Sequence, residues 1–350
     1  MIQLETDNRK AFEDLNEAIS NIDSYNKSKQ IKHLNTALEY VDSSLKNDNN
    51  YLRAIEWNII IHDLLGLHKN IVIEYKDILK EIPESLQQKT LYNLGAAYFH
   101  HYDLKSIDKA IWHFEKALSL NQNIGLDILS KASLGRSYAL RILLGHKHLG
   151  GNDTEEELKT FFDKSVQFSK ESIKMVKSSK DYNDIKNEVI WTAYSALGAA
   201  RMYLHDNERY IADLNTKNFK NYNRILCKSY RDFTRAEKYK PKKWANWSNM
   251  GSALWRRALL YKTYGKKKTA NQLFEKSIET FNFLIKNIRL NYDFALYEMG
   301  KVYRMKEDTI QAKKYFKLAR KYTAIQNNVP IKKIEEEEEM IENKQFGFLA

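Results

Sequence analysis

The chain has 350 residues and a net charge of +12, with 57 Lys and Arg against 45 Asp and Glu. Only 3 Pro and 12 Gly occur, and so few helix breakers favour long helices over a strand-rich or disordered chain. The single Cys227 excludes an internal disulfide and cysteine-based zinc fingers. The sequence contains no run of about 18 apolar residues, so we expect no membrane-spanning helix.

Four helical patterns cover the N-terminal region, at residues 7–23, 28–46, 51–65 and 70–81, and Pro83 ends the last of them. The polar first residues predict no signal peptide. Together with the lone cysteine they favour a cytoplasmic protein.

From residue 88 onward a Leu-Gly or Met-Gly doublet recurs inside helical patterns. Its glycines are Gly95, Gly135, Gly198, Gly251 and Gly300. A glycine within a helix costs about 1 kcal/mol relative to alanine, so we expect a neighbouring helix to approach closely at each one.

A small residue followed four positions later by phenylalanine comes after four of these doublets. The pairs are Ala110 and Phe114, Ser229 and Phe233, Ala270 and Phe274, and Ala312 and Phe316. Residues four apart share a helix face, so each pair predicts a second helix that packs on the doublet. Longer connections are expected near 145–153 and 205–222.

This pattern resembles the tetratricopeptide-repeat (TPR) family over residues 88–326. The resemblance implies an all-α fold, a right-handed α-solenoid of antiparallel helical hairpins. We expect residues 1–87 to form helical hairpins that cap the array. Residues 327–350, which include five consecutive glutamates at 335–339, are predicted to form an acidic C-terminal helix or tail.

No arrangement typical of catalysis or metal binding stands out. The sequence has no glycine-rich phosphate loop and no nucleophile elbow. His100, His101 and His113 lack the spacing of a hydrolytic zinc site, and we interpret them as ordinary surface or hairpin-lining residues. We therefore predict a binding protein that is not an enzyme and carries no cofactor and no metal.

Positive charge is concentrated in residues 201–321, with 29 Lys and Arg against 11 Asp and Glu; the remainder has 28 against 34. Such a segment favours an acidic partner. In the TPR family the first helix of each hairpin lines a concave groove, which implies a set of partner-binding residues here: Tyr203, Trp255, Arg256, Tyr297, Lys301 and Arg304. Aromatic and arginine side chains are typical interface anchors. The hypothesis is a scaffold that binds an acidic peptide or helix in the groove of its basic C-terminal half.

Three alternatives stay open. Basic and aromatic residues interleave at 238–268, which is also typical of RNA or other nucleic-acid binding. A helical-repeat receptor could belong to a peptide-sensing regulator. The glutamates at 335–339 could fold onto the basic groove as an internal inhibitor. The sequence does not indicate an oligomeric state.

Overall fold

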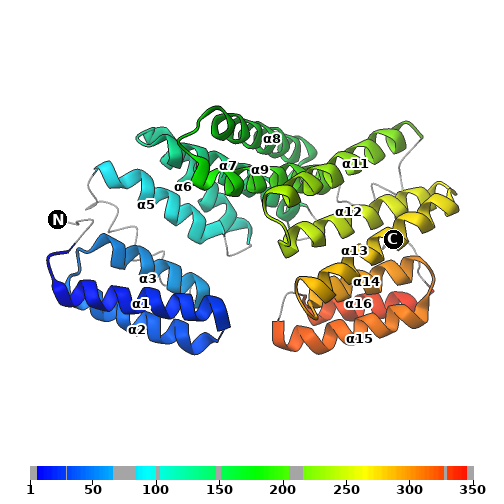
Figure 1. The fold of residues 1–350 in the computed structure, drawn as a ribbon. Coiled ribbons are helices and arrows are strands. Elements are labelled where there is room, and N and C mark those ends of the chain that lie inside the picture. The colour runs from blue at the N-terminus through cyan, green and yellow to red at the C-terminus, as the bar shows by residue number, and fades with distance from the viewer. Residues whose placement is uncertain are drawn as a thin grey trace. The chain divides into compact units, whose positions relative to one another are not determined.

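A computed structural model describes residues 6–28, 30–65, 84–99, 103–146, 151–204, 216–326 and 329–344. These ranges contain fourteen α-helices and no β-strand. Consecutive helices pack as antiparallel pairs, so the predicted all-α fold of helical hairpins is confirmed (Figure 1). The predicted helix at 70–81, His100 and His101 lie outside the described residues.

Two compact units divide the chain, Met1–Ser137 and Tyr138–Ala350. The first unit contains α1 (Arg9–Ser28), α2 (Ile31–Asn47), α3 (Leu52–Leu65), α5 (Glu84–Phe99) and α6 (Leu104–Leu120). Helix α1 pairs with α2, and α5 pairs with α6. The unit boundary falls within α7 (Ile124–Gly145), where Gly135 is buried.

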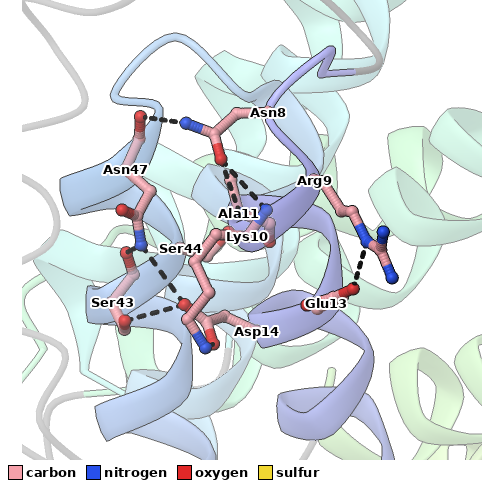
Figure 2. A network of polar contacts seen from close by, with 9 residues as sticks. All are labelled: Asn8, Arg9, Lys10, Ala11, Glu13, Asp14, Ser43, Ser44 and Asn47. Atoms are coloured by element: carbon pink, nitrogen blue, oxygen red, sulfur yellow. Dashed lines mark hydrogen bonds and ion pairs between the residues drawn. The ribbon is translucent and has the colours of Figure 1, made fainter.

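Polar groups join α1 to α2 (Figure 2). The Ser44 hydroxyl donates to the Ala11 carbonyl at 2.7 Å, and the Ser43 hydroxyl donates to Asp14 at the same distance. Burial raises the pKa of Asp14, but hydrogen bonds from Lys10 and Ser43 outweigh it and hold that pKa below its ordinary value. Small residues thus bring these helices together although no Leu-Gly doublet occurs there.

The second unit begins with the last turns of α7 and continues through α8 (Glu155–Ser178), α9 (Asn183–Tyr203) and α11 (Thr216–Tyr239). Helices α12 (Trp244–Thr263), α13 (Lys267–Asn287), α14 (Asp293–Met305), α15 (Thr309–Gln326) and α16 (Ile331–Glu342) follow. The hairpins in this unit are α9 with α11, α12 with α13, and α14 with α15. Residues 216–222 belong to α11, and residues 205–215 lie outside the described ranges.

Four of the doublet glycines lie directly against a phenylalanine ring of the paired helix. A Cβ built on Gly95 would stand 2.7 Å from Phe114, and one on Gly198 would stand 2.7 Å from Phe233. Gly251 and Gly300 meet Phe281 and Phe316 in the same way. Real Cβ atoms do not approach a ring so closely, so the close helix approach expected at these four glycines is confirmed.

The predicted register of α13 is wrong by two helical turns. Phe281, and not Phe274, packs on Gly251, and the Ser277 hydroxyl donates to the Gly251 carbonyl at 2.9 Å. Ser229 makes the matching 2.7 Å hydrogen bond to the Gly198 carbonyl. Phe274 is also buried in the core. Residues seven apart on a helix point the same way, so the sequence pattern fits either phenylalanine.

Candidate functional site

Four of the six predicted partner-binding residues gather between α12 and α14. The Arg256 guanidinium lies 4.4 Å from the Trp255 ring centre. The Lys301 ammonium lies 4.8 Å from the Trp255 ring and 5.5 Å from the Tyr297 ring. These distances are those of cation–π contacts, so the fold brings these four predicted residues into one group.

A buried carboxylate that the sequence analysis missed stands at the centre of this group. Glu298 is only 4% exposed, and it accepts hydrogen bonds from Trp255 Nε1 at 2.6 Å and the Ser252 hydroxyl at 3.1 Å. Lys301 Nζ lies 3.7 Å from its other oxygen. The spacing of Glu298 and Lys301, three residues apart on one helix, was the available signal. Lys301 is therefore neutralised within the fold.

Arg304 is likewise paired inside the protein. Its Nε donates to Glu337 of α16 at 2.6 Å, and both side chains are buried. Arg320 of α15 binds Glu335 at 3.2 Å and Glu338 at 2.5 Å on the same helix. Three of the five tail glutamates thus dock on the last hairpin, where Ile334 and Ile341 are buried with Phe316. These contacts are those of a helix that covers the end of the stack.

Arg256 and Tyr203 differ in their surroundings. Arg256 is partly exposed, and its Nη1 donates to the Ser252 carbonyl at 3.4 Å. Tyr203 lies at the end of α9, where it packs against a cluster from α7, α8 and α9 and against a second cluster from α9, α11 and α12. Its carbonyl accepts a 2.6 Å hydrogen bond from His146 Nε2. Tyr203 therefore lies outside the group around Trp255.

Exposed positive charge in the second unit is concentrated on second helices of the hairpins. The outer face of α11 carries six exposed cations: Lys220, Arg224, Lys228, Arg231, Arg235 and Lys238. Helix α15 contains no acidic residue and exposes four lysines: Lys313, Lys314, Lys317 and Lys321. The net charge of the segment therefore does not translate into a basic lining on α14, whose two cations are buried and paired.

Among the described residues, no three His, Cys, Asp or Glu side chains gather closely enough to hold a metal ion. His113 is buried on α6, where its ring stacks 5.2 Å from that of Tyr98. None of the helices in the described ranges is both long and apolar enough to cross a membrane.

No protein-family model matches the sequence, and no curated protein matches it significantly. Solved structures similar to the chain include the TPR2AB domain of yeast Sti1 in complex with pHSP90, at 12% identity and a TM-score of 0.28, covering 94% of this chain and 97% of that one. The P58(IPK) TPR domain is another, at 13% identity and a TM-score of 0.23, covering 93% and 98%.

Superpositions with such low TM-scores do not establish the fold, which rests on the packing of the chain's own hairpins. A glycine on each first helix of four hairpins faces a phenylalanine on the second helix, four residues after an alanine or serine. That arrangement is the one the TPR pattern predicts. The chain is an all-α protein of repeated, TPR-like helical hairpins.

Proposed function

We propose that the chain is a protein-interaction scaffold, and not an enzyme, that engages an acidic segment of a partner at α12. One observation carries this proposal: Arg256 is a partly exposed guanidinium stacked on the buried Trp255 ring. A stacked guanidinium holds its N–H donors in a fixed plane, which suits carboxylate recognition.

The surrounding charges support an acidic partner. Helix α12 carries Arg256 and Arg257 and no acidic residue, and its third cation, Lys262, pairs with Glu307 at 2.7 Å. Glu298 lies beneath Trp255, but its charge is balanced by Lys301. In this proposal Trp255 positions Arg256, Lys301 lies against the Trp255 and Tyr297 rings, and Arg256 makes the contact with the partner. Arg304 takes part only as an anchor for α16.

The test is a tagged pull-down analysed by mass spectrometry, run with and without nuclease. A partner of the proposed kind is captured by the wild-type chain and is retained after nuclease treatment. Arg256→Glu should abolish its capture because repulsion replaces attraction at the contact. Lys276→Glu, an exposed charge reversal on α13, is the matched control and should retain it.

Equal capture by the wild-type chain and Arg256→Glu would contradict the assignment of Arg256. Lys301 is less suitable for charge reversal, because a carboxylate there would stand beside the buried Glu298 and destabilise the fold. A cytoplasmic location and a role as a peptide-sensing regulator stay predictions.

A further inference from the structure

The outer face of α11 presents a continuous row of positive charge. Its members recur every three or four residues, namely Lys220, Arg224, Lys228, Arg231, Arg235 and Lys238. At 100° per residue they fall within an arc of about 80°, and from first to last they span about 27 Å. The buried residues of α11, among them Leu226 and Phe233, lie on the opposite side and pack on neighbouring helices. The row therefore faces solvent along the whole helix.

The carboxylates on α11 pair with one member of this row, Arg235. Asp232 is buried and pairs with Arg201 of α9 and, at 3.4 Å, with Arg235. Glu237 lies near the end of the helix, where it accepts a 2.7 Å hydrogen bond from the backbone amide of Lys242. Among the described residues, Lys220, Lys228 and Lys238 have no carboxylate partner. Most of the row's charge is thus available to a ligand.

The row offers charge without an apolar anchor. Phe219, Tyr222 and Phe233 of α11 are buried, and none of the large apolar side chains exposed in the described residues belongs to α11. Protein interfaces usually depend on buried aromatic or aliphatic anchors. Single-stranded nucleic acids are held by stacking on exposed aromatics, and membrane-surface helices insert apolar side chains. A regular polyanion that needs none of these is the phosphate backbone of a duplex.

We propose that the outer face of α11 is a sequence-independent binding surface for the phosphate backbone of duplex nucleic acid. This surface is separate from the proposed contact at Arg256, and neither proposal requires the other. Duplex DNA carries one charge per about 1.7 Å of axis, so a row of this length can meet several phosphates at once. Lysine and arginine would bind them by ion pairing, with release of condensed counterions.

The probe is a fluorescein-labelled 20-base-pair DNA duplex of arbitrary sequence, titrated with the full chain from 50 to 300 mM KCl. The test variant is Lys220→Gln/Lys228→Gln/Lys238→Gln, and glutamine preserves helix propensity. The control, Lys313→Gln/Lys317→Gln/Lys321→Gln, removes the same charge from exposed lysines four residues apart on α15.

We expect the α11 variant to weaken binding by about a hundredfold or more at 0.1 M salt, and to lower the slope of log K against log salt by about 3. The α15 control should stay within a few fold of the wild-type chain. If the triple variant fails to fold by circular dichroism, Lys228→Gln alone should lower the slope by about 1.

Three outcomes would overturn the proposal. The wild-type chain could fail to bind the duplex, or the two triple variants could weaken binding equally, which would indicate diffuse attraction to the net charge. The row could also bind a fluorescein-labelled polyglutamate peptide, or vesicles of phosphatidylcholine and phosphatidylserine, in preference to the duplex. Either preference would assign the row to an acidic protein or to a membrane surface.

Discussion

Helices α14 and α11 both contain cations, but the fold uses their charges in opposite ways. On α14, Lys301 and Arg304 are buried and pair with Glu298 and Glu337, so their charges are neutralised within the fold. On α11, six cations form an exposed row, and within the described ranges only Arg235 pairs with a carboxylate. The difference shows that net charge along a segment says little about where a partner meets positive potential.

Burial decides between the two uses. A charge removed from water is tolerated only with a close counter-charge, so the α14 cations are structural elements whose loss or isolation is costly. A solvated charge costs almost nothing to keep and contributes little to stability. Removing one partner of a charge pair of α14 should therefore lower the free energy of unfolding strongly. Removing an exposed cation of α11 should change binding and leave stability nearly unchanged.

The largest effect is expected for Glu337→Gln, which leaves the Arg304 guanidinium buried without its counter-charge. Removing one partner of a buried pair lowers the free energy of unfolding by about 3–5 kcal/mol. Urea unfolding followed by circular dichroism measures it. Glu336→Gln on the same helix is the control, because Glu336 is exposed and lies 4.0 Å from Lys332. The contrast between α14 and α11 breaks down if the two variants have the same stability.

His113 in the first unit is neither paired with a counter-charge from the described residues nor solvated. It is buried as a neutral group. Burial, with a smaller effect from Lys109, lowers the pKa of His113 from 6.5 to about 4. Because the unfolded chain binds the proton first, stability should be full above about pH 6.5 and fall as the pH drops, by up to about 3 kcal/mol near pH 4.

The measurement is urea unfolding at several pH values, in which His113→Phe should keep the ring packing on Tyr98 and lose this part of the pH dependence. Carboxylates titrate in both proteins, so the difference between their profiles reports His113. Parallel profiles would show that His113 titrates normally.

A smaller effect is expected for Gly251→Ala, which tests the packing that holds α12 on α13. The new Cβ would stand 2.6 Å from the Phe281 ring, so the helices must shift. We expect a loss of about 1–3 kcal/mol in unfolding free energy, despite the higher helix propensity of alanine. Adding Phe281→Leu should couple favourably with Gly251→Ala in a double-mutant cycle. Simple additivity would show that the ring is not the obstacle.

The smallest effect on stability belongs to the exposed row. Lys228→Gln should change the unfolding free energy by less than about 0.5 kcal/mol, since its side chain is exposed and has no carboxylate partner in the described ranges. The same urea titration measures it. A loss comparable to that of Glu337→Gln would make the α11 row a structural feature and remove its contrast with α14.

The sequence alone determined the hairpins. Close approach of two helices needs glycine or another small residue at the contact. The contacting phenylalanine follows an alanine on the second helix by four residues, so Gly95 with Phe114 and Gly300 with Phe316 could be predicted as pairs. The sequence also places Tyr297 and Lys301 on one face of α14, because residues four apart share a helix face.

Only the tertiary structure decided the register of α13 and the use of each charge. Phe274 and Phe281 differ by two turns and point the same way, so periodicity could not choose between them. Arg304 is neutralised by a glutamate on α16, far along the chain, and no local pattern specifies such a pair. Which cations are buried depends on how the helices pack, and packing is settled by contacts between distant residues rather than by composition.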